Sequence, residues 1–136
     1  MLSDSAAPPA PERGLALVDV LVLLVALALL LAVAVPELSA ARRRSVQSGL
    51  RSDLRRLAAA QESYFYDHRV YAADPADLQV AGFRLSPGVR IAVNEATQTG
   101  WSATASHDET HARCFVFVRG AAPLGSAGRP GEIRCS

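Results

Sequence analysis

An apolar run near the N-terminus constrains the fold of this chain more than any other feature. Residues 15–35 carry a single charged side chain, Asp19, and Pro36 follows the run directly. In a helix that rises ~1.5 Å per residue, such a run is roughly 30 Å long, which matches the hydrocarbon core of a bilayer. No soluble domain of this size needs such a helix, so we expect residues 15–36 to form a membrane-spanning helix.

Length and charge narrow the remaining possibilities. The chain has 136 residues, so the part outside the membrane helix is one small domain. Its formal net charge of +1 is too small for an electrostatic nucleic-acid binder. The sequence contains no Gly-rich phosphate loop, nucleophile elbow or pair of catalytic carboxylates. We therefore expect no enzymatic activity, no cofactor and no nucleic-acid partner.

The segment before the run, residues 1–14, is rich in alanine and proline and ends in Arg13 and Gly14. Its composition is typical of an unstructured leader. An ordinary secretory signal is one interpretation, with a small-residue cleavage site at residues 32–34 or 39–41. However, the run exceeds the apolar core of about 7–15 residues that such signals have, and they prefer a more basic start.

The acid inside the run requires an explanation. A carboxylate in a membrane helix costs roughly 2.5–3.5 kcal/mol at the bilayer centre, less near an interface, and usually marks a partner. If the chain were cut after Gly14, Leu15 would gain a free α-amine at the membrane edge. Asp19 of a neighbouring subunit could then neutralise that amine. The alternative is a plain anchor in which Asp19 reaches up to the interface.

These features together resemble the type IV pilin and pseudopilin family. A basic residue and glycine (Arg13 and Gly14), an apolar helix from Leu15, an acid at Asp19 and a proline at Pro36 agree with the family in spacing. The resemblance is strongest over roughly residues 13–80. Asp19 stands where the family nearly always has glutamate, and Leu15 where phenylalanine is common.

The resemblance implies a processing and assembly route. Residues 1–14 would be a leader that a prepilin peptidase removes after Gly14, and Leu15 would then be N-methylated. Asp19 and Pro36 would serve filament assembly. The implied partners are other copies of the chain, related pilins, the inner-membrane assembly machinery and, before assembly, membrane lipid. The chain would first cross the inner membrane once, with its head in the periplasm, and later join an extracellular filament.

The charges on either side of the apolar run predict the opposite orientation of the membrane helix. The three arginines at residues 42–44 outnumber Arg13, so the positive-inside rule would place the C-terminus in the cytoplasm. The two cysteines, Cys114 and Cys135, which could form a disulfide, and the family resemblance favour an exported head. We adopt the exported orientation, because residues 42–44 fit a helix that continues several residues beyond the bilayer.

Beyond the proline the apolar pattern becomes one-sided. Pro36 is expected to bend the helix or to free a carbonyl, because its ring clashes with the preceding turn. Apolar residues then recur every three or four positions, so residues 37–70 are predicted to be an amphipathic continuation of one long helix. We expect its stripe to pack on the chain's own head. The positions of the stripe are Leu38, Val46, Leu50, Leu54, Leu57, Gln61, Tyr64 and Phe65.

Residues 71–136 are predicted to form the globular head. After Gly82 the apolar residues alternate, as at Val89 and Ile91, with turn residues between the runs. This pattern indicates about three antiparallel strands, with a fourth at residues 133–135 and a loop at residues 120–131. The predicted fold class is α+β, a long bent N-terminal helix packed on a small antiparallel sheet, as in type IV pilins.

Two cysteines, Cys114 and Cys135, lie in the last quarter of the chain. A disulfide helps most in a small head with one loop to close, and it would place the head outside the cytoplasm. The alternative is two unrelated thiols.

Two polar clusters could suggest metals. His107 and His111 are four residues apart, but their segment is predicted to be a hairpin turn rather than a helix, and a third ligand is missing. Asp67, Asp74 and Asp77 lack the dense oxygen pattern of a calcium loop. We expect no metal site.

The sequence therefore predicts a structural protein, a filament subunit that polymerises through its apolar helix. A pseudopilin of a type II secretion system is the first alternative, because it would use the same helix. A membrane-anchored periplasmic ligand-binding domain is the second, and in it Gly14 and Asp19 would have no special role.

Overall fold

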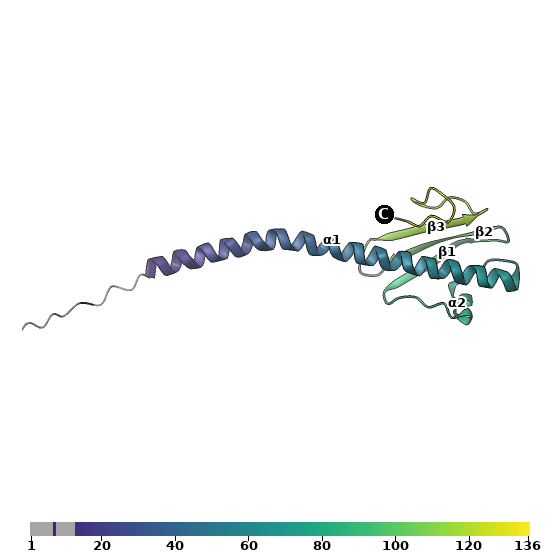
Figure 1. Ribbon diagram of the computed structural model, residues 1–136, viewed down its shortest axis with the longest axis horizontal. Helices are drawn as coiled ribbons and strands as arrows, with labels where there is room; N and C mark the ends of the chain where they lie inside the picture. Colours follow the sequence, from purple (N-terminus) through teal and green to yellow (C-terminus); the bar gives the residue numbers. More distant parts are fainter. Residues whose placement is uncertain (1–6, 8–12) are drawn as a thin grey trace, which may run out of the picture. The chain divides into compact units, whose positions relative to one another are not determined.

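A computed structural model describes residue 7 and residues 13–136, with side chains described at residue 7 and from residue 16 onward. The predicted leader, residues 1–14, lies almost wholly outside the described residues. The chain divides into two compact units, Met1–Ser39 and Ala40–Ser136. One helix, α1 (Arg13–His68), passes through both units, and the remaining elements belong to the second (Figure 1).

In the first unit, α1 is apolar all round. Every side chain described from Ala16 to Ser39 is exposed, and this helix is the one described helix long and apolar enough to cross a membrane. Pro36 lies inside the helix without ending it. Proline has no N–H to donate to the preceding turn. One residue earlier, the Val35 carbonyl accepts a hydrogen bond from the Ser39 hydroxyl at 3.1 Å.

In the second unit, α1 packs by the predicted stripe. Leu50, Leu54 and Leu57 are fully buried, and Val46, Tyr64 and Phe65 pack at the edge of the same core. Leu38 is different, because it belongs to the first unit and is 69% exposed. The stripe that packs on the head therefore begins about two turns later than the sequence pattern indicates.

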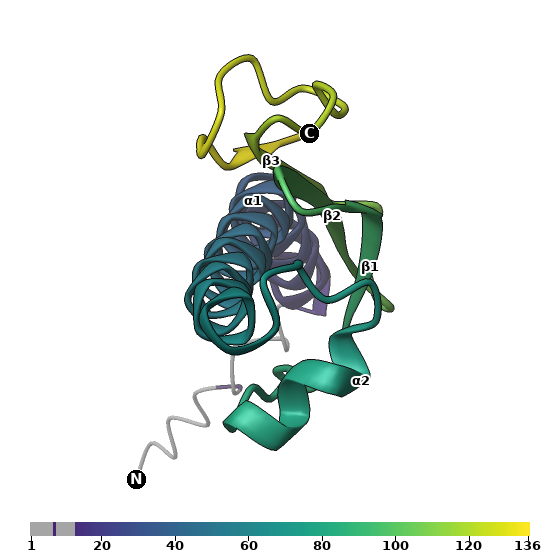
Figure 2. The same cartoon turned by 90° about the vertical axis from the view of Figure 1, so that its right-hand side faces the viewer.

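The head contains a four-stranded antiparallel sheet in the order β1-β2-β3-β4. The strands are β1 (Val89–Ala96), β2 (Gly100–His107), β3 (Arg113–Arg119) and the short β4 (Arg134–Cys135). The second part of α1 lies across one face of this sheet (Figure 2). The predicted α+β fold class and the fourth strand are both confirmed.

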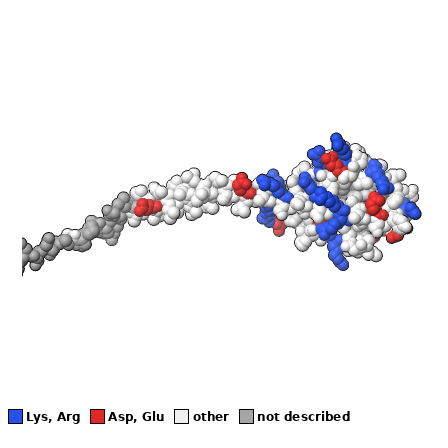
Figure 3. All heavy atoms as spheres, in the orientation of Figure 1, with Lys and Arg blue, Asp and Glu red and all other residues white. Residues whose placement is uncertain are grey.

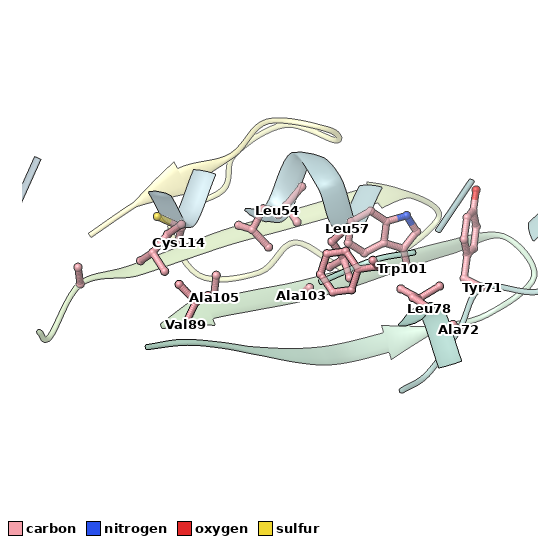
Figure 4. Close-up of a cluster of buried hydrophobic side chains, with 14 residues drawn as sticks. Leu54, Leu57, Tyr71, Ala72, Leu78, Val89, Trp101, Ala103, Ala105 and Cys114 are labelled. Carbon is pink, nitrogen blue, oxygen red and sulfur yellow. The ribbon is translucent and has the colours of Figure 1, made fainter. Parts of the chain in front are cut away.

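The main core fills the space between α1 and the sheet. Trp101, Ala103 and Ala105 alternate along β2 and are fully buried, as the period-two pattern predicts. Small alanines let the sheet approach the leucines of α1, and the side chain of Trp101 lies beside Leu57 (Figure 4). The opposite face of β3 carries a second, smaller cluster around Phe117.

The segment between α1 and β1 is short and irregular. It contains α2 (Pro75–Leu78) and the single 3₁₀ turn η1 (Gln79–Ala81). Asp74 caps α2, because its carboxylate accepts a hydrogen bond from the Ala76 N–H at 2.8 Å. The chain then leaves the turn through Gly82 in the left-handed region, at φ 88°. Leu78 from α2 is buried in the main core, which fixes this segment to the head.

Candidate functional site

The apolar part of α1 in the first unit is the strongest candidate for a functional surface. Its large side chains are exposed on all sides, for example Leu17 at 75% and Leu30 at 69%. Exposure of a continuous apolar surface of this length to water is energetically unfavourable. The segment therefore requires either lipid or the helices of other molecules around it.

Asp19 is an acid within this apolar surface. Its side chain is exposed, and among the described residues no ion pair or hydrogen bond engages its carboxylate. Asp19 follows Leu15 by four residues, so the two positions share one face of the helix, about 6 Å apart along its axis. Any group that forms at the Leu15 nitrogen would lie one turn from this carboxylate.

The other predicted processing residues are only partly described. Gly14 and Leu15 lie within α1, but their surroundings and the leader before them are outside the described side chains. Their roles in cleavage and N-methylation stay predictions. Pro36 lies inside the exposed apolar helix, in the same unit as Asp19.

Cys114 and Cys135 lie directly opposite each other on β3 and β4 and form a disulfide, which agrees with the pairing expected from the sequence. The neighbouring pair, Arg113 and Ser136, exchanges two backbone hydrogen bonds of 3.1 and 2.9 Å. The cysteines therefore occupy the non-hydrogen-bonded position of the ladder, where opposite side chains come closest. The register between β3 and β4 is therefore sufficient to place the two sulfurs next to each other.

The loop that the disulfide closes is packed, which the sequence did not indicate. Phe117 is buried together with Ala121 and Ala127, and Phe115 and Leu124 pack against them. The Gly131 N–H donates to the Phe117 carbonyl at 2.7 Å, which fixes the far end of the loop. Residues 120–131 thus cover the face of β3 that points away from α1.

Arginine supplies all the basic charge of this protein. The sequence contains no lysine, so its 14 basic residues are all arginines. They gather on the second unit, whereas the first unit shows mostly uncharged surface (Figure 3). A shallow groove beside the disulfide contains three of them, and its lining residues are Arg51, Arg55, Gly131, Glu132, Ile133 and Arg134.

The hairpin between β2 and β3 holds the histidine pair considered above. Asp108 forms an ion pair with Arg90 at 2.6 Å, and Glu109 pairs with Arg42. His107 accepts the Glu109 N–H through Nδ1 at 3.2 Å. The two acidic residues of the turn, Asp108 and Glu109, are therefore each paired with an arginine. Within residues 13–136, no three His, Cys, Asp or Glu side chains are placed to hold a metal ion.

Two buried polar residues of α1 organise the head. Asp53 is fully buried and accepts hydrogen bonds from the Ser86 N–H (3.1 Å) and hydroxyl (2.9 Å), and it pairs with Arg56. Gln61, which the sequence suggested only as a member of the stripe, holds the backbone of Ala72. In the sequence, the only indication of these roles was that Asp53 and Gln61 are polar residues at positions where the stripe would place apolar ones.

A third polar contact joins the end of α1 to β3. The Tyr71 hydroxyl donates to Glu62 at 3.1 Å, and Arg119 approaches the other oxygen of Glu62 at 3.5 Å. Burial raises the pKa of Tyr71 above its ordinary value, and the hydrogen bond to Glu62 adds to this effect. Arg119 has a left-handed backbone, at φ 56°.

No protein-family model matches the chain, and no curated protein matches it significantly. Any functional conclusion therefore depends on the residues described above.

Proposed function

We propose that this chain is a structural subunit of a type IV pilus-like filament, which polymerises through the apolar part of α1 after a prepilin peptidase removes residues 1–14. One observation carries the proposal. A continuous apolar helix that is exposed on all sides contains Asp19, whose carboxylate has no ion-pair partner among the described residues, one turn beyond the Gly14–Leu15 junction. The spacing of these residues and Pro36 resembles that in type IV pilins, and this resemblance implies a role for the helix in filament assembly.

Assembly would replace lipid contacts by helix contacts. In the bilayer the apolar surface of α1 is already covered by lipid. Its burial against other helices is therefore driven by packing and by polar pairing. Asp19 of one subunit would neutralise the Leu15 amine of its neighbour. Near the membrane edge, such a pair removes part of the charge cost, which reaches roughly 2.5–3.5 kcal/mol at the bilayer centre. Because only one axial offset joins the two groups, the pair would also set the register between subunits.

The disulfide supports an exported head. Disulfides persist in oxidising compartments and are rare in the cytoplasm. The Cys114–Cys135 bond therefore favours a second unit that lies in the periplasm before assembly and on the extracellular filament afterwards. In this orientation the arginines at residues 42–44 would lie outside the cytoplasm, against the positive-inside rule.

A pseudopilin of a type II secretion system would use the same helix and the same chemistry. The packed, disulfide-closed loop of residues 120–131 favours a pilus subunit, since in the family a loop of this kind is often exposed on the filament. Surface filaments released by shearing would support the pilus, whereas their absence together with a defect in protein secretion would support the pseudopilin.

Mass spectrometry of the mature N-terminus tests the proposal directly. We expect a chain that begins at Leu15 with an N-methyl group. An intact Met1, or a start near Val35, would contradict both filament functions and favour a plain anchor or a secretory signal.

A further inference from the structure

One sulfur of the disulfide lies beside a cation. The guanidinium Nε of Arg51, on α1, is 3.3 Å from Cys135 Sγ. The two residues are 84 positions apart, so only the folded second unit creates this contact. Among the described residues Arg51 forms no ion pair with a carboxylate. Its charge is therefore free to act on the sulfur.

The two sulfurs also differ in access. Cys114 is fully buried in the main core, whereas Cys135 is only partly buried. Cys135 lies on β4, which has two residues and pairs with the rest of the sheet on one side only. An external reagent therefore has better access to Cys135 than to Cys114.

The charged groups near Cys135 come from two segments. Arg51 on α1 contacts its sulfur, and Arg55, also on α1, lines the groove beside the disulfide. Glu132, the acid in the lining of the groove, is paired with Arg134 at 2.8 Å. The surroundings are therefore net cationic, and neighbouring cations favour the thiolate form of a cysteine, which is the reactive form.

We propose that Cys135 is the sulfur through which this disulfide is made and exchanged with an external thiol–disulfide oxidoreductase, and that Arg51 is the positioning residue that stabilises its thiolate. Nothing in this chemistry requires filament assembly. An enzyme with a reactive disulfide in an oxidising compartment is the only co-reactant.

The reaction has two exchange steps. The Cys135 thiolate attacks one sulfur of the enzyme's disulfide, a mixed disulfide forms, and the second enzyme sulfur leaves as a thiolate. The Cys114 thiol then loses its proton to solvent and attacks Cys135 Sγ from inside the sheet, and the enzyme leaves as its dithiol after protonation. The chain loses two electrons and two protons, and the enzyme disulfide is reduced by the same two electrons.

The first test measures the two thiols separately. Cys114→Ala leaves Cys135 as a free thiol in the full chain, and Cys135→Ala leaves Cys114. At neutral pH we expect iodoacetamide to alkylate Cys135 much faster than Cys114. Adding Arg51→Met to the Cys114→Ala chain should slow alkylation of Cys135 by about three- to tenfold, whereas Arg51→Lys should restore most of the rate.

Arg55→Met is the matched control, because Arg55 lines the same groove and makes no contact with the sulfur. It should change the rate less than about twofold. Equal effects of Arg51→Met and Arg55→Met, or no effect of either, would overturn the role of Arg51. Equal reactivity of the two thiols would overturn the role of Cys135.

The second test uses the unaltered chain and so does not depend on how the cysteine variants fold. The intact disulfide is incubated with glutathione, quenched with acid and digested, and the mixed disulfide is located by mass spectrometry. We expect glutathione on the peptide that contains Cys135, because Cys114 is fully buried and an external thiol has better access to Cys135. This result tests access alone, since a stabilised Cys135 thiolate would by itself favour attack at Cys114. Glutathione mainly on Cys114, or equally on both, would contradict the proposal.

Discussion

Gln61 and Ala72 are joined by two hydrogen bonds: the Gln61 amide donates to the Ala72 carbonyl at 2.8 Å, and its oxygen accepts the Ala72 N–H at 2.8 Å. The side chain thus pairs with the backbone as a neighbouring strand would. Both groups are buried, so neither has water as a substitute. This contact holds the chain against the helix that it has just left.

Replacing Gln61 by leucine should therefore destabilise the head strongly. The substitution keeps the size of the side chain but leaves a buried N–H and carbonyl without partners, which should lower the free energy of unfolding by about 2–4 kcal/mol. Denaturant unfolding of the full chain in detergent can be followed by the fluorescence of Trp101, the single tryptophan. Gln79→Leu, at an exposed position, is the control and should stay near wild type.

Asp19→Ala should leave membrane insertion intact but abolish filaments, because the neighbouring Leu15 amine would lose its partner. Cell fractionation and microscopy of sheared filaments measure the two effects. Glu37→Ala is the matched control, since Glu37 is also an exposed acid of the first unit. It should still assemble. Normal filaments from Asp19→Ala would refute the proposed pairing.

Asp19→Glu tests whether filament assembly requires only the carboxylate charge or also the shorter side chain of aspartate. Glutamate keeps the carboxylate and is one methylene longer, so it should assemble at least as well as the natural residue. Loss of filaments in this variant, with insertion unchanged, would show that the shorter side chain is required.

Tyr71 should make stability depend on alkaline pH. Its pKa is raised in the folded chain, first by burial and then by the hydrogen bond to Glu62. Above about pH 10, the usual tyrosine value, the unfolded chain releases this proton while the folded chain keeps it. The contribution of Tyr71 to stability is therefore complete below that pH and is lost as pH rises through the folded pKa.

The measurement compares unfolding free energies at about pH 8 and about pH 11, on either side of the usual tyrosine pKa. Wild type should lose more stability over this range than Tyr71→Phe, which cannot ionise. Tyr66→Phe is the control, because Tyr66 is 76% exposed, and its pH dependence should match wild type. Parallel curves for wild type and Tyr71→Phe would contradict the assigned role.

Gly125→Ala should loosen the disulfide-closed loop. Gly125 has φ 56°, and a Cβ there would lie 2.5 Å from the ring of Phe115. Left-handed strain and the clash together should cost at least about 1–2 kcal/mol of unfolding free energy. Gly128→Ala is the matched control in the same loop, because an added Cβ there meets nothing within 4 Å. Equal stability of the two variants would show that the loop does not press on Phe115.

Much of the fold could be predicted because it depends on local periodicity. The long helix, the buried leucines at residues 50, 54 and 57 and the alternation along β2 all follow from which positions share a face. The candidate assembly segment was equally visible, since the length of an apolar run and the position of Asp19 need no tertiary information. Leu38 was placed wrongly because periodicity shows a stripe but not where the head that covers it begins.

The contacts that only the tertiary structure decided join residues far apart in the chain. Asp53 meets Ser86, Arg51 meets Cys135 and Gly125 meets Phe115 because the register of the sheet and its position on α1 bring them together. A cysteine count could suggest a pair, but the position directly opposite on β3 and β4 follows from strand pairing. The sequence by itself determined the membrane-length helix and its acid, since these depend on hydrophobicity along the chain. The polar network of the head and the cation at Cys135 depend on three-dimensional proximity, and only the folded chain supplies that.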